Sequence, residues 1–184
     1  KPFLLVVSFL NPHDICLPYG GRSSLLPNLW KKYQPAPEAK VPPLPANFGE
    51  TAGGLNNLRG PYQSKSDPWD EKQWQRHRYA YFRMVEDVDQ QVGQVLAALR
   101  QTGQEDNTVI VFTSDHGEGL GSHRWNGKEM FYDEEAAVPL IVSWKGVTPA
   151  GRIDREHLVS TLDVLPTICD FAGIQVPPAM RGGS

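Results

Sequence analysis

A run of β-branched and aromatic side chains, Thr108–Thr113 (TVIVFT), constrains the fold of this 184-residue chain more than any other feature. Such a run, apolar on both faces, is typical of a central strand in a parallel sheet that helices cover on each side. It stops at Ser114-Asp115-His116-Gly117, and in open α/β sheets ligands bind beyond the carboxyl ends of strands. The sequence therefore predicts an α/β fold, a mostly parallel sheet flanked by helices, with a functional site near residues 115 and 116.

Length and composition favour one globular domain and exclude several functions. A chain of 184 residues suits a single domain, and its net charge of −3 provides no basic surface, so we expect no nucleic-acid partner. No apolar stretch approaches the roughly 20 residues needed to span a bilayer. The two cysteines make neither a disulfide framework nor a metal knuckle, and Cys169 is expected in the core. Both ends of the chain look cut.

Four further elements follow from the apolar pattern. Phe3–Phe9 and Val138–Trp144 are predicted to be strands, and residues 164–172 to be a helix that Gly173 ends. One long helix is predicted to begin with Asp67 as N-cap and Pro68 in the first turn, and to end at Gly103. Its buried stripe is expected at Tyr81, Val85, Val88, Val92, Val95, Leu96 and Leu99.

Residues 18–68 form a proline- and glycine-rich excursion without sustained periodicity. A loop of this length in a compact domain is usually functional or a linker. We expect it to cover the site or to help to select a substrate.

Asp115 and His116 are the first candidates for chemistry. A carboxylate oxygen and an imidazole nitrogen on adjacent residues can both bind one divalent cation. The simpler interpretation is an aspartate that caps the next turn beside a histidine that forms structural hydrogen bonds. Two ligands do not complete a site, because a hard cation takes six or more oxygens and a catalytic zinc takes three protein ligands. Further ligands are expected elsewhere in the chain or beyond it.

Lys128 follows this pair after a glycine-rich loop. An ammonium beside a metal would repel it unless an anionic group lay between them, which is the arrangement of a site for a sulfate or phosphate ester. The alternative is a solvated loop lysine. His123, on the same loop, is a second candidate for contact with the substrate.

His13 lies at the exit of the predicted strand Phe3–Phe9, in the turn Asn11-Pro12-His13-Asp14. If the two apolar strands are near neighbours, His13 and Asp115 face one crevice, and the imidazole could protonate a departing alkoxide. The alternative is a histidine in a surface turn, with Asp14 as a cap or an orienting group.

Several motifs, in this order, resemble the catalytic domain of the sulfatase family, within the alkaline phosphatase-like superfamily. Residues 109–142 (VIVFTSDHGEGLGSHRWNGKEMFYDEEAAVPLIV), preceded by the helix at 78–99, resemble the second half of that domain. Residues 3–16 (FLLVVSFLNPHDIC) resemble the family's strand with its Pro-His-Asp turn, and residues 163–174 resemble the segment that follows. The resemblance covers nearly the whole chain except 18–68, and the spacing from Asp115 to Lys128 agrees with the family's.

The resemblance implies an alkaline phosphatase-like core, of which residues 1–184 are one part, truncated at both ends. It assigns Asp115 and His116 as metal ligands. It also assigns Lys128 as a contact to the sulfate ester and His13 as the proton donor to the leaving group. The usual cation in sulfatases is calcium, although the ligand chemistry alone also allows Mn²⁺ or Zn²⁺.

The family's nucleophile is a formylglycine, made from a cysteine or serine in a Cys-x-Pro-x-Arg motif near the start of the domain, where two further metal-binding aspartates lie. Cys16-Leu17-Pro18-Tyr19-Gly20 begins like this motif but has glycine in place of arginine, and it follows the Pro-His-Asp turn that the family's motif precedes. We interpret Cys16 as a chance look-alike. The formylglycine is expected upstream of Lys1, and residues 1–184 alone are expected to be inactive.

The parent protein is therefore expected to be a metal-dependent sulfuric ester hydrolase that acts on a sulfated small molecule or glycan. One alternative is a phosphodiesterase, phosphonate hydrolase or phosphoethanolamine transferase of the same superfamily, which the upstream nucleophile would distinguish. Another is a non-catalytic relative that binds an anionic glycan. The resemblance implies a periplasmic, secreted or lysosomal location. No feature of the sequence selects an oligomeric state or one natural substrate.

Overall fold

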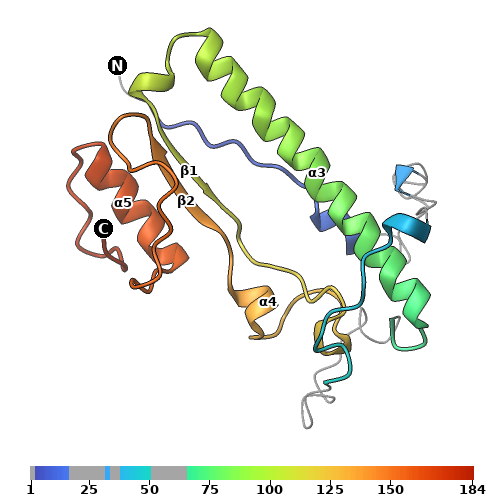
Figure 1. The fold of residues 1–184 in the computed structure, drawn as a ribbon. Coiled ribbons are helices and arrows are strands. Elements are labelled where there is room, and N and C mark those ends of the chain that lie inside the picture. Colours follow the sequence, from blue (N-terminus) through green and yellow to red (C-terminus); the bar gives the residue numbers. More distant parts are fainter. Residues whose placement is uncertain (1–2, 17–31, 34–37, 51–65) are drawn as a thin grey trace. The chain divides into compact units, whose positions relative to one another are not determined.

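The computed structural model describes residues 3–16, 32–33, 38–50 and 66–184 (Figure 1). The chain divides into two compact units. The first contains residues 1–7, 99–115 and 139–184, and the second contains residues 8–98 and 116–138. The division falls between Asp115 and His116, so the two candidate metal ligands belong to different units.

The first unit holds a pair of strands, β1 (Val109–Thr113) and β2 (Leu140–Trp144). They pair antiparallel, with Val109 opposite Trp144 and Thr113 opposite Leu140. Helix α5 (Val164–Phe171) belongs to the same unit, and its Phe171 ring meets Trp144 edge-on at a centroid distance of 5.9 Å. Cys169 is buried on this helix, as its apolar pattern predicted.

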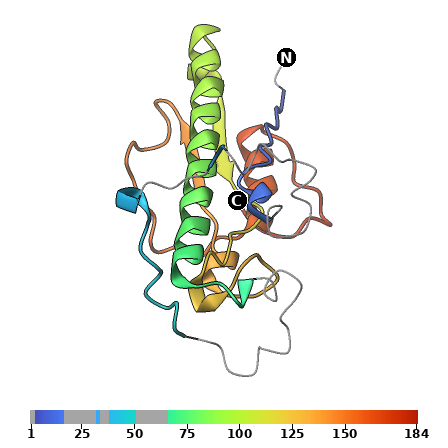
Figure 2. The ribbon, with the colours of Figure 1, turned by 90° about the vertical axis from the view of Figure 1, so that its right-hand side faces the viewer.

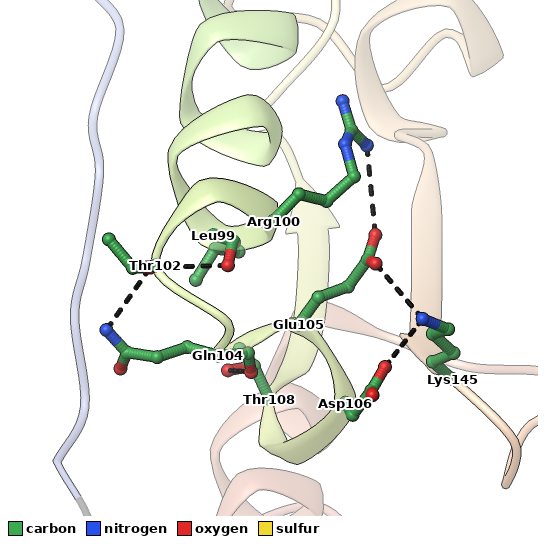
Figure 3. A network of polar contacts seen from close by, with 8 residues as sticks. All are labelled: Leu99, Arg100, Thr102, Gln104, Glu105, Asp106, Thr108 and Lys145. Atoms are coloured by element: carbon green, nitrogen blue, oxygen red, sulfur yellow. Dashed lines mark hydrogen bonds and ion pairs between the residues drawn. The ribbon is translucent and has the colours of Figure 1, made fainter.

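A network of charged side chains joins the turn before β1 to the end of β2 (Figure 3). Lys145 follows β2, and its Nζ lies 2.6 Å from Asp106 Oδ1 and 3.3 Å from Glu105 Oε2. Glu105 Oε1 also lies 3.7 Å from Arg100 Nη1, at the end of the preceding helix. These side chains are largely exposed, and exposed ion pairs contribute little to stability.

Two predictions about the sheet differ from the structure. The β1–β2 pair is antiparallel rather than parallel, and Phe3–Phe9 lies outside any strand. The side chains of this segment are exposed, with 74% of Val6 accessible to solvent. A strand needs a hydrogen-bonding neighbour as well as a suitable pattern of side chains. An apolar run indicates burial on both faces, but it contains no information on which partner pairs with it or in which direction.

The long helix α3 (Glu71–Gln101) begins after Asp70 rather than after the predicted N-cap Asp67. The Gln73 N–H donates to Asp70 Oδ1 at 2.8 Å, and the Asp70 N–H donates to Gln73 Oε1 at 2.9 Å. This reciprocal capping box satisfies the free N–H groups of the first turn. The predicted N-cap was wrong because Asp67 and Asp70 are both suitable caps. The local sequence pattern does not show which of them begins the helix.

The C-terminus of α3 agrees with the prediction. Gly103 has a φ of +67°, in the left-handed region that favours glycine, and the Gln104 N–H bonds to the Leu99 carbonyl at 3.0 Å. This is the Schellman arrangement that ends many helices. Figures 1 and 2 show α3 as one unbroken helix.

The core of the second unit packs on the first half of α3. Its buried cluster comes from three segments of the chain and comprises Ile15, Tyr33, Ala80 and Met84. The predicted stripe at residues 81–99 is only partly correct: Tyr81 packs against this cluster, but Val85 is 41% exposed. The buried positions of α3 are Trp74, His77, Ala80 and Met84, all in the first half of the helix, where Ile15 and Tyr33 pack against it.

The excursion at 18–68 lies largely outside the described residues. Within it, Phe48 is buried and its ring meets Trp74 of α3 edge-on at a centroid distance of 5.8 Å. Among the described residues, no helix combines the length and the apolar character that a bilayer crossing demands.

Candidate active site

Asp115 lies just beyond β1 in the first unit. The strand ends at Thr113, and the exposed Asp115 carboxylate lies 3.3 Å from the hydroxyl of Ser114, which donates to it. The position at the end of an apolar strand agrees with the sequence prediction. The role of Asp115 as a metal ligand stays a prediction.

In the second unit, His116 and Lys128 are brought together. Lys128 Nζ donates to His116 Nε2 at 2.7 Å, and both side chains are partly buried. The other ring nitrogen, Nδ1, lies 2.7 Å from the Gly117 carbonyl oxygen. Since a carbonyl oxygen only accepts and an ammonium only donates, the ring is the neutral tautomer with its proton on Nδ1.

The glycine-rich segment between these residues folds into a closed loop, which we call the 118–127 loop. The Gly119 N–H donates to the Gly127 carbonyl at 2.8 Å, and the Gly121 N–H donates to the Trp125 carbonyl at 2.9 Å. The Glu118 carboxylate accepts a further hydrogen bond from the Gly127 N–H. These bonds pair the start of the loop with its end, and so return Lys128 to His116.

The backbone around this loop is strained. Four residues other than glycine have positive φ angles within ten positions: Leu120 (48°), His123 (54°), Arg124 (53°) and Glu129 (93°). Each such residue costs on the order of 1–3 kcal/mol, and strained residues cluster at functional sites. The surrounding hydrogen bonds offset this cost, which is consistent with a loop shaped for a function.

Helix α4 (Asp133–Ala136) braces the segment that follows His116. The Gly117 N–H donates to the Glu135 carbonyl at 2.8 Å, and the Glu118 N–H donates to the Glu134 carbonyl at 3.0 Å. A Cβ atom on Gly117 would lie 1.9 Å from the Glu134 carbonyl oxygen, so only glycine fits there. The glycine after His116 is therefore required by tertiary packing.

Two carboxyl groups near the His116–Lys128 pair were missed in the sequence. Burial raises the pKa of the Glu118 carboxyl, and the N–H groups of Gly127 and Leu120 partly oppose that shift. Burial, followed by the charge of Glu118, raises the pKa of Glu135 to about 7. The acidic stretch that contains Glu135 resembles a solvated turn, so no signal in one sequence separates it from a surface charge.

His13 begins the short 3-10 helix η1 (His13–Cys16) in the second unit. Half of its side chain is exposed, and its Nδ1 lies 3.7 Å from the carboxylate of the buried Asp14. At the other end of η1, the Cys16 thiol has a raised pKa, caused by burial and then by the charges of Asp14 and Glu118. A raised pKa keeps the thiol protonated, which agrees with the interpretation that Cys16 is not a nucleophile.

His123 lies on the 118–127 loop but is held by other segments. Its Nδ1 donates to the Glu50 carbonyl at 3.0 Å, and its Nε2 accepts from Asn47 Nδ2 at 3.2 Å. The ring stacks on Tyr132, with centroids 4.2 Å apart. Asn47 Nδ2 also donates to Glu134 Oε1 at 2.8 Å. These contacts attach part of the excursion to the loop, a function that the sequence did not suggest for His123.

The ligand chemistry of His116 fits a divalent cation. A metal-binding histidine usually donates one ring N–H to a carbonyl or carboxylate, which fixes the tautomer and leaves the other nitrogen for the metal. His116 has this arrangement, with Nδ1 bonded to Gly117 and Nε2 bearing the lone pair. Among the described residues no group of three or more potential metal ligands occurs.

Comparison with known proteins identifies the family. A family model described as Sulfatase matches residues 1–174. The chain is 33% identical to the delta 4,5-hexuronate-2-O-sulfatase of Bacteroides thetaiotaomicron, over 99% of this chain and 38% of that protein. The chain thus spans less than half the length of this relative.

Solved structures show the same fold. A 2-O GAG sulfatase matches with a TM-score of 0.77 and 31% identity, over 95% of this chain and 38% of its own. The phosphonate monoester hydrolase of Silicibacter pomeroyi matches with a TM-score of 0.64 and 32% identity, over 79% of this chain and 31% of its own. These matches confirm the predicted α/β, alkaline phosphatase-like architecture.

Proposed function

The chain belongs to the sulfatase family, and from this premise we propose that the whole protein hydrolyses a sulfate ester. The observation that carries the proposal is the distance of 2.7 Å between Lys128 Nζ and His116 Nε2. In this contact the Lys128 ammonium, which can bind an anionic ester oxygen, lies beside an imidazole nitrogen whose lone pair suits a divalent cation.

Lys128 is proposed to bind an anionic oxygen of the ester. Its hydrogen-bonding partner, His116, is a neutral imidazole, so this contact does not neutralise the ammonium charge. An ammonium held close to the ester oxygens stabilises the negative charge that develops in the transition state.

Asp115 and His116 are proposed to hold a divalent cation, with Ca²⁺ preferred and Mn²⁺ or Zn²⁺ as alternatives. Such a cation supplies Lewis-acid polarisation of the ester oxygens. His116 Nε2 now accepts from Lys128, so a cation held by this nitrogen would take the place of that hydrogen bond.

His13 is proposed to donate a proton to the alkoxide that leaves the sulfur. Its half-exposed ring can exchange protons with solvent, and Asp14 lies 3.7 Å from Nδ1, where the carboxylate can orient the ring. A positioned general acid of this kind typically contributes about 10²–10⁴-fold to the rate.

The proposed substrate is a sulfated glycan. The support is the printed specificity of two similar proteins, a delta 4,5-hexuronate-2-O-sulfatase and a 2-O GAG sulfatase. A second candidate is hydrolysis of a phosphonate monoester, which the likeness to a phosphonate monoester hydrolase favours. Lysine and a divalent cation would bind the oxygens of either ester.

The test uses the full-length protein. The purified protein is assayed with calcium on an aryl sulfate, on an unsaturated uronate 2-O-sulfate and on a phenylphosphonate monoester. Turnover of the sulfates with the higher kcat/KM is expected, together with loss of turnover in Lys128→Ala. Turnover of the phosphonate alone would select the second candidate, and binding of the uronate sulfate without turnover would indicate a non-catalytic relative.

A further inference from the structure

A buried carboxyl group that the proposed chemistry does not use lies beside the His116–Lys128 pair. Glu135 belongs to the four-residue helix α4, yet only 3% of its surface is exposed, whereas Asp133 of the same helix is exposed. Burial of a carboxyl group costs free energy unless its hydrogen bonds are satisfied. A residue of this kind in so short a helix therefore needs an explanation.

Glu135 forms hydrogen bonds to both segments of the site. Its backbone carbonyl accepts from the N–H of Gly117 at 2.8 Å, directly after His116. Its side-chain Oε2 accepts from the N–H of Met130 at 2.7 Å, two residues after Lys128. Glu135 therefore holds the backbone at Gly117, directly after His116, and at Met130, two residues after Lys128.

Glu135 Oε1 is buried and has no hydrogen-bonding partner among the described residues. Burial and the neighbouring carboxylate of Glu118 raise the pKa of Glu135 to about 7. The hydrogen bond from the Met130 N–H opposes part of this rise in pKa, and the side chain can accept that bond in either protonation state.

The backbone near Lys128 needs such an anchor. Gly127 and Glu129, on either side of the lysine, have φ angles of 90° and 93°. A strained non-glycine residue persists only where its surroundings over-determine its conformation. The bond from Met130 to Glu135 is the restraint that directly follows Glu129.

We propose that Glu135 is a positioning residue for the reaction. Its side chain is long enough to accept a hydrogen bond from the Met130 N–H, and this bond fixes the position of Lys128 relative to His116. The predicted effect of Glu135 on the reaction rate rests on the proposed function. Its predicted effect on the backbone at Met130 does not. A displacement of about 1 Å in a catalytic group can cost on the order of 100-fold in rate.

Two substitutions in the full-length protein separate the effect of the length of the Glu135 side chain from the effect of its charge. Glu135→Gln keeps an acceptor oxygen at the same distance and removes the acid, whereas Glu135→Asp keeps the acid and shortens the side chain by one methylene. We expect kcat of Glu135→Gln to stay within about threefold of wild type. We expect Glu135→Asp to lose about 10–100-fold, mainly in kcat rather than KM.

Amide hydrogen exchange and thermal unfolding complete the test. The Met130 amide should exchange faster in Glu135→Asp and at the wild-type rate in Glu135→Gln. Asp133→Ala, in the same helix, is the matched control and should leave both kcat and exchange unchanged. Equal losses in the Gln and Asp variants, or losses that follow Tm alone, would overturn the proposal.

Failure of the proposed function gives a different result. In that case the wild-type protein turns over no sulfate ester, and the exchange of the Met130 amide still reports on Glu135. The affinity for inorganic sulfate, measured by calorimetry, then replaces kcat: it should fall in Glu135→Asp and persist in Glu135→Gln. Unchanged exchange and affinity in Glu135→Asp would overturn the positioning role independently of the activity.

Discussion

Lys128 Nζ lies 2.7 Å from His116 Nε2, although twelve residues separate the two in the sequence. The contact joins an ammonium donor to an imidazole lone pair, so it leaves the positive charge of Lys128 without a counter-charge from His116. The proposed function would replace this contact with a cation on the nitrogen and an anionic ester oxygen on the lysine.

Replacement of Lys128 tests the anion-binding role. Lys128→Ala in the full-length protein should lower kcat by about 10²–10³, which is the typical effect of the loss of one preorganised oxyanion stabiliser. Lys145→Ala is a suitable control, because this exposed lysine pairs with Glu105 and Asp106 in the other unit. A decrease below about fivefold in Lys128→Ala would mean that the lysine is a solvated loop residue.

Removal of the Asp115 carboxylate tests the metal-binding role. Asp115→Ala should abolish most of the bound cation, because a hard cation depends on carboxylate oxygens. Metal content after dialysis, measured by atomic emission, gives the result directly. Asp106→Ala, which removes an exposed aspartate from the same unit, should retain full occupancy. Equal metal content in the two variants would exclude Asp115 from the ligands.

The leaving-group dependence tests His13. His13→Ala should slow hydrolysis of alkyl or sugar sulfates far more than that of nitrophenyl sulfate, because only a poor leaving group needs a proton in the transition state. The ratio of kcat/KM for the two classes of substrate is the quantity to compare with wild type. An unchanged ratio would argue against the role of general acid.

The raised pKa of Glu135, about 7 rather than 4.5, predicts a pH-dependent stability. Between these pH values the folded protein binds more protons at this group than the unfolded chain, so its contribution to the free energy of unfolding falls as pH rises, by up to about 3 kcal/mol. Glu135→Gln removes this contribution. The variant should therefore gain stability relative to wild type between pH 5 and pH 8.

Urea denaturation at several pH values measures this difference. The buried His77, whose pKa is lowered to about 3, contributes an opposite slope, but it is present in both proteins and cancels in the comparison. A difference in unfolding free energy that is constant from pH 5 to pH 8 would contradict the prediction.

The reactivity of Cys16 tests the interpretation that the sequence around it is only a chance look-alike of the formylglycine motif. Because burial and nearby carboxylates raise its pKa, iodoacetamide should modify it several-fold more slowly than a free cysteine at pH 8. The measurement is best made in a Cys169→Ser background, so that only one thiol reacts. Cys16→Ser should also leave sulfatase activity intact, and a loss of activity would restore Cys16 as a candidate for chemistry.

Local features of the fold were predictable where one short segment determines the outcome. The run before Asp115 gives β1, and Gly103 ends α3 because its backbone needs a positive φ. Phe3–Phe9 has as good an apolar pattern as β1 but is not a strand, since pairing depends on a partner that the pattern does not specify. The predicted start of α3 was wrong for a related reason, because two suitable N-cap residues, Asp67 and Asp70, lie three residues apart.

The site divides in the same way. The proximity of His116 and Lys128 could be predicted, because the two residues lie at the two ends of a glycine-rich loop. Glu135 and Glu118 could not be found, because their significance comes from burial, and burial of an acidic residue is a property of its neighbours. The attachment of His123 to Asn47 was equally hidden, since it joins segments 76 residues apart.

The closed geometry of the 118–127 loop has a consequence for recognising relatives. Hydrogen bonds between Gly119 and Gly127 fix the two ends of the loop, while Gly121 and Trp125 close its tip. Additional residues inserted at the tip would leave the ends, and therefore His116 and Lys128, where they are. A search pattern that demands a constant number of residues between these two positions would overlook enzymes with an identical site and a longer tip. A pattern that tolerates insertions at the tip would retain them.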